Sequence, residues 1–383
     1  MEIYFDNAAT TRLSARAAAR MERVAREHYG NASSLHLAGL RAEEELKVAA
    51  EEIAKTLKAE PRELIFTSGG TESDNLAILG TARSRKGYGR HLITSAVEHP
   101  AVLESMRFLE EQGFRLTVLP VDASGKISLA ELEAAIRKDT VLVSLMYVNN
   151  EIGAIQPIAE AAALIHRLNP DCYFHVDAVQ AYGKFEIYPK RLGIDMMSVS
   201  SHKIHGPKGV GFLYVNRRVS IKPVSFGGGQ QGRLRSGTLN VPGIAGMAEA
   251  ACEAYEDFEA KRERLLCIKN RILAGATELP GVRANSAPGM ESAPQIVSLS
   301  VEGVRAEVLL HALEAEGVYV SSGSACSSNH PGISATLKGI GLPAKLLDAT
   351  VRLSFSAENT EAEAERFLEL FRQLVPKLRQ FKR

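Results

Sequence analysis

The sequence Leu64-Ile65-Phe66-Thr67-Ser68-Gly69-Gly70-Thr71-Glu72-Ser73 predicts a short apolar strand, a glycine-containing turn and a helix that begins near Glu72. The same unit, a strand followed by a helical pattern, then repeats along the chain. Strands are expected at residues 91–95, 115–120 and 141–148, before helices that begin at Ala101, Leu129 and Ile158. Three more strands are expected at residues 173–176, 196–200 and 210–215. Such alternation is typical of an α/β fold with a mostly parallel sheet and helices on both faces.

The pattern changes after the glycine-rich stretch at residues 227–229. A long helix is expected to begin near Pro242 and to run past Leu265. A smaller α+β unit follows, with its elements at residues 295–301, 306–316, 318–320, 351–354 and 361–378. We therefore expect a large domain over residues 14–255 and a small domain made of residues 1–13 and 256–383.

The composition excludes several classes of protein. The chain has 383 residues, 45% of them apolar, with 46 Lys and Arg against 45 Asp and Glu, a formal net charge of +1. Because the positive and negative charges are nearly equal in number, the protein has no overall electrostatic field that would attract a nucleic acid or an anionic membrane surface. No apolar stretch approaches the roughly 18 residues of a membrane-spanning helix. We expect neither a nucleic acid nor a membrane as a direct partner.

The first residues do not fit a targeting peptide. The Ala- and Arg-rich residues 12–26 resemble a transit peptide, but such peptides lack acidic residues, and Glu2, Asp6, Glu22 and Glu27 lie in or near the segment. An amphipathic helix with Arg on its solvent face explains it better. The four cysteines form no C-x-x-C pair and follow no signal peptide. We expect free thiols, no metal site and a cytoplasmic protein.

Three segments place chemically useful groups where a strand ends, which is where ligands bind in open α/β sheets. In the first, the small residues 68–70 let a ligand approach the backbone. The N–H groups at the start of the helix could bind a phosphate together with the Thr71 hydroxyl. The alternative is a plain glycine-containing turn with Thr71 as the N-cap of the helix.

The second segment, His175-Val176-Asp177-Ala178-Val179-Gln180, ends an apolar strand. Residues 175 and 177 share one face of that strand, and a carboxylate such as Asp177 can form a salt bridge with a protonated heteroaromatic nitrogen. Two alternatives stay open. One is a metal site on His175 and Asp177, which needs a third ligand, and the other is a structural cap made by Asp177.

The third segment, Ser200-Ser201-His202-Lys203-Ile204-His205-Gly206-Pro207-Lys208-Gly209, leaves a strand for a turn rich in Gly and Pro. Lys203 lies there among hydroxyl and imidazole groups, where a lysine can serve as a nucleophile toward a carbonyl carbon. A solvated turn lysine is the alternative. A nucleotide-binding P-loop is excluded because the chain has no G-x-x-x-x-G-K-[ST] pattern.

These segments and four others occur in an order that resembles the pyridoxal-phosphate cysteine desulfurases of the NifS/IscS type, which are class V aminotransferases. The others are Val97-Glu98-His99, Asn149-Asn150-Glu151-Ile152-Gly153, Arg235-Ser236-Gly237-Thr238 and Ser321-Ser322-Gly323-Ser324-Ala325-Cys326-Ser327-Ser328. The resemblance extends from Tyr4-Phe5-Asp6-Asn7-Ala8-Ala9-Thr10-Thr11 to the C-terminal helix. It implies fold type I of the pyridoxal-phosphate enzymes with a seven-stranded sheet, a homodimer, and pyridoxal 5'-phosphate as cofactor.

The resemblance also implies a role for each matching residue. Lys203 would bond the cofactor, Asp177 would pair with its pyridinium nitrogen, and His99 would stack on its ring. The phenolic oxygen of the cofactor would be bonded by Gln180. Its phosphate would be held by Gly70, Thr71, Ser200 and His202, and the phosphate in the partner subunit would be reached by Thr238. Asn150 and Arg352 would bind the substrate carboxylate.

Cys326 differs from the other cysteines because its loop of Ser, Gly and Ala residues has no apolar surface to pack in a core. We expect Cys172, Cys252 and Cys267 to be core residues. By the resemblance, Lys203 would remove the α-proton of L-cysteine and the Cys326 thiolate would attack its sulfur. L-Alanine would leave, and the persulfide would remain on Cys326, which could also ligate an iron–sulfur cluster transiently. Since this loop must serve both substrate and acceptor, we expect it to be mobile.

Several positions depart from the family pattern: Ala32, Val179, Gln231 and residues 356–360, which lack the frequent Gly-Arg before Asn-Thr. They remove no catalytic group but leave the sulfur acceptor open. The sequence predicts a cytoplasmic, homodimeric cysteine desulfurase that serves an iron–sulfur scaffold or a tRNA thiolation protein. The alternatives are a selenocysteine lyase, another fold type I enzyme such as an aminotransferase, and a catalytically silent scaffold. Cys326 argues against an aminotransferase, which needs no thiol, and the intact cofactor residues argue against a silent scaffold. Selectivity for cysteine over selenocysteine stays open.

Overall fold

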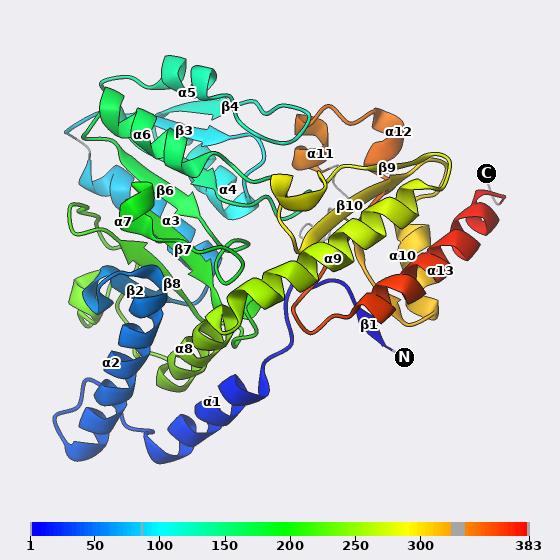
Figure 1. Ribbon diagram of the computed structural model, residues 1–383. Coiled ribbons are helices and arrows are strands. Elements are labelled where there is room, and N and C mark those ends of the chain that lie inside the picture. Colours follow the sequence, from blue (N-terminus) through cyan, green and yellow to red (C-terminus); the bar gives the residue numbers. More distant parts are fainter. Residues whose placement is uncertain (1, 86, 323–333, 381–383) are drawn as a thin grey trace.

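The computed structural model describes residues 2–85, 87–322 and 334–380 (Figure 1). The chain forms a large unit and a small unit, each built on its own main sheet. The small unit holds both the N-terminal strand and the C-terminal helix. Among the helices that these residues form, none is both long enough and apolar enough to cross a membrane.

In the described part of the chain, seven strands form the sheet of the large unit, in the order β2-β8-β7-β6-β5-β3-β4. Their bounds are β2 Leu64–Thr67, β3 His91–Ser95, β4 Arg115–Leu119, β5 Thr140–Met146, β6 Tyr173–Asp177, β7 Met196–Ser200 and β8 Gly211–Val215. All neighbours are parallel except β8, which runs antiparallel to β2 and β7. The predicted, mostly parallel sheet is confirmed.

Helices cover both faces of this sheet, as the alternation along its strands requires. On β8, Phe212 and Tyr214 pack in one core cluster, and Leu213 packs in the other. Helices α2, α6 and α8 contribute to the first cluster, and α3 and α4 contribute to the second. The helices of this unit are α1 Ala15–Glu27, α2 Leu37–Leu57, α3 Gly70–Ser84, α4 Pro100–Glu111, α5 Leu129–Ala135, α6 Ile158–Leu168, α7 Pro189–Leu192 and α8 Val241–Tyr255.

The small unit is built on an antiparallel sheet in the order β12-β13-β10-β9. Its elements are α9 Phe258–Thr277, β9 Val282–Ala284, β10 Ile296–Val301, α10 Ala306–Ala315, β11 Val318–Tyr319, β12 Ser321–Ser322, α11 Ala335–Gly339, α12 Ala344–Leu347, β13 Thr350–Ser354 and α13 Glu361–Arg379. The N-terminal strand β1, Ile3–Tyr4, pairs in parallel with β11, and Phe5 packs in the core of this unit. The chain therefore begins in the small unit and then crosses to the large one. The domain boundaries that we expect, after residues 13 and 255, stay a proposal.

The expectation of one long helix from Pro242 past Leu265 is wrong, because α8 and α9 divide this stretch. Between them, Glu256 is extended and Asp257 adopts the left-handed conformation with φ 47°. Asp tolerates that conformation better than most residues do. Beyond the break, α9 extends from the large unit to the small one (Figure 1).

The three described cysteines are free thiols, but they are not equally buried. Cys172 is buried directly before β6, and burial raises the pKa of its thiol far above the ordinary value. Cys252 is partly exposed and Cys267 is exposed. The predicted core position is therefore confirmed for Cys172 and wrong for Cys267, whose thiol lies on the solvent side of α9 beside Glu361.

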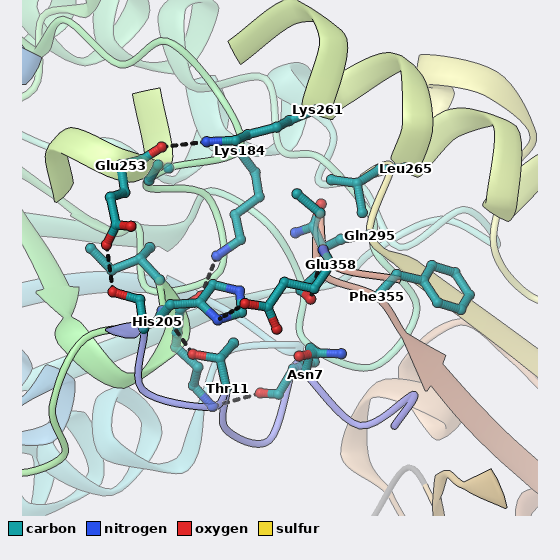
Figure 2. Close-up of a pocket in the computed structure, with 18 of the residues that line it drawn as sticks. Asn7, Thr11, Lys184, His205, Glu253, Lys261, Leu265, Gln295, Phe355 and Glu358 are labelled. Atoms are coloured by element: carbon teal, nitrogen blue, oxygen red, sulfur yellow. Dashed lines mark hydrogen bonds and ion pairs between the residues drawn. The ribbon is translucent and has the colours of Figure 1, made fainter. Parts of the chain in front are cut away.

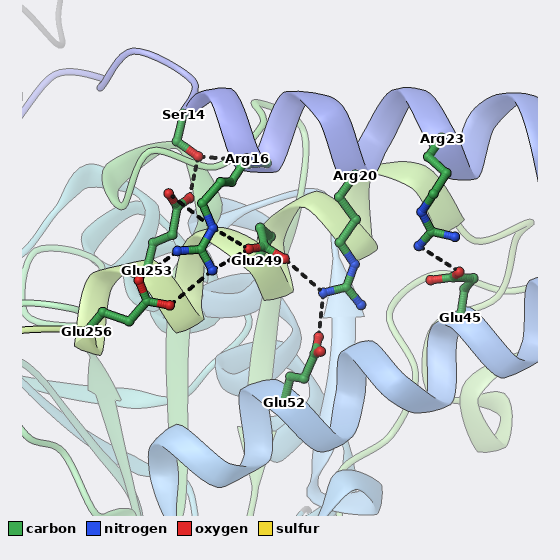
Figure 3. A network of polar contacts seen from close by, with 10 residues as sticks. Ser14, Arg16, Arg20, Arg23, Glu45, Glu52, Glu249, Glu253 and Glu256 are labelled. Atoms are coloured by element: carbon green, nitrogen blue, oxygen red, sulfur yellow. Dashed lines mark hydrogen bonds and ion pairs between the residues drawn. The ribbon is translucent and has the colours of Figure 1, made fainter.

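Helix α1 confirms the amphipathic helix predicted from residues 12–26, but its residues Arg16 and Arg20 face two other helices, and Arg20, contrary to expectation, is not on the solvent face (Figure 3). Arg16 lies 2.7 Å from Glu249 on α8, and Arg20 lies 2.6 Å from Glu52 on α2. A single exposed ion pair contributes only about 0–1 kcal/mol. The Arg20 side chain, however, is 11% exposed and also reaches Glu249, so the pairs form one network across three helices.

Candidate active site

A cavity of about 250 Å³ lies where the parallel strands of the large sheet end. The ends of β5, β6 and β7 border it, together with the first turn of α3 and the residue before α4. Parallel strands end at the same edge of a sheet, so residues from distant parts of the sequence meet there. Nine predicted site residues line the cavity: Gly70, Thr71, His99, Asn150, Asp177, Gln180, Ser200, His202 and Lys203.

Two of the other predicted residues, Arg352 and Thr238, do not line this cavity. Arg352 is buried on β13, where Nη1 donates to the Asn150 carbonyl at 2.9 Å and Nη2 lies 2.8 Å from Oδ1 of Asp6. It is therefore one hydrogen bond away from the cavity wall. Thr238 is exposed in the segment between β8 and α8. Cys326 lies outside the described residues, so its loop stays a prediction.

Asp177 is the buried acid of the cavity. It ends β6, is 6% exposed, and accepts a hydrogen bond from the N–H of Val179 at 2.9 Å. Burial raises the pKa of this carboxyl, and His99, the Val179 hydrogen bond and Lys203 oppose the shift. A buried carboxylate is stable only with a cationic or hydrogen-bonding partner. A protonated ring nitrogen in the cavity would be such a partner.

His99 is positioned by the helix that it precedes. As the N-cap of α4, its Nδ1 accepts from the N–H of Ala101 at 3.1 Å, which places the proton of the neutral ring on Nε2. Burial lowers the pKa of His99, although the charge of Asp177 opposes this and that of Lys203 adds to it. A neutral imidazole in the wall suits stacking on an aromatic ring.

The Lys203 amino group is held by the segment that crosses between the two units. Its Nζ donates to the carbonyls of Ala8 and Ala9, each at 2.6 Å. Thr11 binds the same turn, because its N–H donates to the His202 carbonyl at 2.9 Å. The sequence did not predict these acceptors, since a backbone carbonyl leaves no mark in the residue type.

A layer of buried polar side chains lies at the cavity. Its members are Glu98, Asp74, which lines the cavity and was not predicted, and His175, which the sequence offered only as a metal ligand. Asp74 and Glu98 each have one carboxyl oxygen with no hydrogen-bond partner among the described residues. Asp74 could have been suspected from the sequence, because it lies in the first turns of a helix that follows two glycines. Burial raises the pKa of its carboxyl, and the charge of Asp177 adds to the shift.

The metal alternative for His175 and Asp177 gains no support. The two ring nitrogens of His175 are hydrogen-bonded to Ser144 at 2.8 Å and to Ser198 at 2.9 Å. Burial lowers the pKa of His175 to about 3, so the ring is neutral. In the described part of the chain, no group of three His, Cys, Asp or Glu side chains could hold a metal ion.

Glu98 should make the stability of the cofactor-free protein depend on pH. Burial raises the pKa of this carboxyl from the ordinary 4.5 to about 8. The unfolded chain loses the proton near pH 4.5, so this group lowers stability as pH rises from there, and its effect levels off above pH 8. In Glu98→Gln that effect is absent. The melting temperature of the variant minus that of the wild type should therefore increase by about 4 °C or more between pH 5 and pH 8.

Glu104→Gln is the matched control, because Glu104 lies on α4 with a side chain that is 67% exposed. The difference between this variant and the wild type should not change with pH. A difference for Glu98→Gln that is equally constant would contradict the prediction.

The cavity fits pyridoxal 5'-phosphate at both polar ends. At one end, the N-cap of α3 is Gly69, which provides no side-chain cap, so the N–H groups at the helix start can bind a phosphate. A Cβ on Gly70 would lie 2.7 Å from Cγ2 of Val179, so only glycine leaves this space open. At the other end lies Asp177, and Lys203 lines the wall as well.

Comparison with known proteins agrees with this geometry. Residues 3–367 match the aminotransferase class-V family. A NifS/IcsS protein homolog of Lactobacillus delbrueckii subsp. bulgaricus is 43% identical over 375 residues, which cover 97% of each chain. A cysteine desulfurase IscS of Methanosarcina thermophila is 41% identical over 98% of this chain and 93% of its own.

Solved structures are similar as well. A NifS-like protein shares 37% identity with a TM-score of 0.93, over 99% of this chain and 100% of its own. SspA in complex with cysteine shares 35% identity with a TM-score of 0.81, over 93% of this chain and 99% of its own. By both sequence and structure, the chain belongs to the class-V aminotransferases and, within them, to the pyridoxal-phosphate cysteine desulfurases of the NifS/IscS type.

Proposed function

We propose that the protein converts L-cysteine to L-alanine and passes the sulfur to an acceptor protein through a persulfide on Cys326. The observation that carries this proposal is the meeting of Lys203, Asp177 and His99 in one cavity, beside the uncapped start of α3. Relatives named cysteine desulfurase IscS support it. A selenocysteine lyase and an aminotransferase are not favoured.

Pyridoxal phosphate, when bound, supplies an electron sink that stabilises negative charge at the α-carbon of an amino acid. Asp177 would keep its ring nitrogen protonated, and His99 would cover the ring. Lys203 would carry the cofactor and, once displaced by substrate, take the α-proton at Nζ. The remaining contacts would be made by Gln180 to the phenolic oxygen and by Gly70, Thr71, Ser200 and His202 to the phosphate.

Arg352 and Asn150 would bind the substrate carboxylate. Asp6 and the carbonyl of Asn150 already hold the two terminal nitrogens of Arg352, so its guanidinium is oriented before substrate arrives. Its Nε has no partner among the described residues. One donor of the planar group is therefore left for a carboxylate.

The chemistry at sulfur would belong to Cys326. Its thiolate would bond the substrate sulfur while the bond from that sulfur to the substrate Cβ breaks. The electron pair goes to the carbon, which takes a proton and leaves as L-alanine. An acceptor thiol can then remove the outer sulfur by exchange. We propose an iron–sulfur scaffold or a tRNA thiolation protein as the acceptor; the same thiol would ligate a cluster only transiently.

Product analysis tests this function directly. The purified, cofactor-loaded protein should form alanine and sulfide from L-cysteine in equal amounts when excess thiol is present. Alanine from L-selenocysteine but not from L-cysteine would identify a selenocysteine lyase instead. Consumption of a 2-oxo acid with an amino-acid donor would identify an aminotransferase.

A cytoplasmic location forms part of the proposal. Reducing compartments keep thiols free, and the three described cysteines are all free. The even charge balance supports a protein acceptor rather than direct binding of a nucleic acid or a membrane surface.

We also propose that the protein acts as a homodimer. Four large apolar side chains are exposed on the loop between α1 and α2 and on the first turns of α2. They are Tyr29, Leu35, Leu37 and Leu40, with exposed fractions of 76%, 105%, 62% and 44%. An exposed apolar patch of this kind is typical of an interface between proteins. Thr238 supports a dimer as well, because it is exposed and would reach a phosphate only across the interface.

Leu35→Glu combined with Leu37→Glu should convert the dimer to a monomer. Two charges desolvated in an apolar interface should raise the dissociation constant by about a hundredfold or more. Light scattering after size-exclusion chromatography measures the mass. Val308→Glu is the control, since Val308 is 45% exposed on α10 in the small unit. A variant that stays dimeric would place the interface elsewhere, and a monomeric wild type would reject the proposal.

A further inference from the structure

A second cavity, of about 230 Å³, lies where the large and small units meet (Figure 2). Residues of both units line it, among them Lys184, Ile204, Leu265, Gln295 and Phe355. It shares Ala8, Gln180 and Lys203 with the active-site cavity. A ligand in it would therefore touch the residues that hold the cofactor without occupying the active site.

Lys184 brings a cation to this cavity without an acidic partner. Its Nζ donates to the backbone carbonyl of Lys203. No carboxylate of the described residues lies within 4.0 Å of that nitrogen. An ammonium group has three donors, so two of them stay unused. Burial lowers the pKa of Lys184 to about 7, and the charge of Lys203 adds to the effect. A desolvated ammonium of this kind is stabilised by an anion.

The two carboxylates in the cavity wall are occupied by other partners. Glu253 lies 3.7 Å from Arg16 and accepts a hydrogen bond from the Ser14 hydroxyl. Glu358 lies 4.0 Å from His205, whose pKa is lowered by burial. The Glu358 side chain is 63% exposed, so water solvates it as well. Neither acid neutralises Lys184, whose charge is left for a ligand.

Gln295 adds a second unmet group. Its side chain is 2% exposed, and its Nε2 donates to the Gln180 carbonyl at 2.9 Å. Its Oε1 has no hydrogen-bond partner among the residues that the structure describes. A buried acceptor without a partner costs about 1–3 kcal/mol, so a ligand with a donor would find a favourable contact here.

The rest of the wall restricts the ligand further. Ile204, Leu265 and Phe355 are apolar, so the body of the ligand is short and apolar. The volume, about 230 Å³, lies below the roughly 300–1,000 Å³ of pockets for drug-sized molecules. One carboxylate would match the charge of Lys184 without placing a second negative charge against the apolar part of the wall.

We propose that this cavity is a binding site for a small carboxylic acid with a 2-amino or 2-hydroxyl group. The carboxylate pairs with Lys184, and the 2-substituent donates to Oε1 of Gln295. Because the wall combines residues of both units with the backbone of Lys203, the bound acid joins the units directly behind the cofactor lysine.

Calorimetric titration of the cofactor-loaded protein with L-lactate tests the site. Lactate has the carboxylate and the donor, but it has no amine with which to bond the cofactor. We expect saturable binding of one lactate per chain. Lys184→Gln should weaken it about tenfold or more, because a charge-assisted hydrogen bond is lost. Absence of saturable binding would overturn the proposal.

Two control variants separate this site from its surroundings. Lys261 lines the same cavity, but its charge already acts on the carboxylate of Glu256 while its ammonium donates to the Glu253 carbonyl, so Lys261→Gln should leave the affinity unchanged. Arg352→Lys should also leave it unchanged. Binding that disappears with Arg352→Lys but survives Lys184→Gln would place lactate in the active site and overturn the proposal.

Gln295→Leu tests the contact between the 2-substituent and Oε1 of Gln295. It also tests the proposal if the Lys184→Gln variant does not fold. Propionate, which lacks the 2-hydroxyl group, should bind the wild type several-fold more weakly than lactate. Gln295→Leu should remove this difference between the two acids. Equal binding of both acids to the wild type would overturn the assignment of Gln295.

Discussion

Replacing Lys203 by alanine should remove the covalent lysine–cofactor bond and lower the turnover of L-cysteine by about a thousandfold or more. Among the described residues that line the active-site cavity, Lys203 is the one amine. Neither the Schiff-base bond nor removal of the α-proton has a substitute there. Borohydride reduction followed by peptide mass spectrometry locates the bonded lysine, and alanine release measures turnover.

Lys208→Ala is the matched control for this variant. Lys208 lies in the same turn but is exposed and outside the active-site cavity, so its loss should leave both readouts unchanged. A borohydride-stable cofactor adduct of undiminished yield in Lys203→Ala would refute the assignment of Lys203.

The second large effect is expected for Cys326→Ala. This variant should bind the cofactor and L-cysteine normally, yet form alanine and persulfide at least about a thousandfold more slowly, because no other nucleophile receives the sulfur. Binding should survive because all nine predicted residues that line the cofactor cavity are unchanged in this variant. Absorbance of the bound cofactor measures binding, and mass spectrometry of the intact protein measures the added sulfur.

The exposed Cys267 provides the control for the thiol chemistry. Cys267→Ala should retain full activity and a persulfide on Cys326. Full alanine formation by Cys326→Ala would refute the role of Cys326, and a persulfide found only on Cys267 would reassign it.

The fold could be predicted where the hydrophobic pattern is strong. Most strands of the large sheet are short apolar runs bounded by turn residues, and their length favours strands over helices. Helix α2, Leu37–Leu57, was missed although its sequence is rich in helix-forming residues. The break at Asp257 was missed because one residue in the left-handed conformation does not interrupt an apolar pattern.

In the candidate site, too, the side chains that follow apolar strands could be predicted from the sequence, but the contacts that depend on tertiary packing could not. Asp177 and Lys203 follow apolar strands, so their placement at one sheet edge could be expected from topology. The pairing of Arg352 with Asp6 could not, because it joins residues 346 positions apart. The pairing of Lys184 with the Lys203 carbonyl depends on how two loops pack, which no local pattern encodes.

The segment from Phe5 to Ala9 sets an order of events during synthesis. Its carbonyls hold Lys203, but the segment is itself held by the last strand: the N–H of Ala8 donates to Oγ of Ser354 at 2.8 Å, and the N–H of Ser354 donates to the Phe5 carbonyl at 2.7 Å. A ribosome releases the N-terminus first, so the large sheet can form while this segment still lacks its partners. The lysine turn is therefore made long before its acceptors are in place. The cofactor site closes only when β13 has left the exit tunnel, so cofactor capture has to follow the synthesis of that strand.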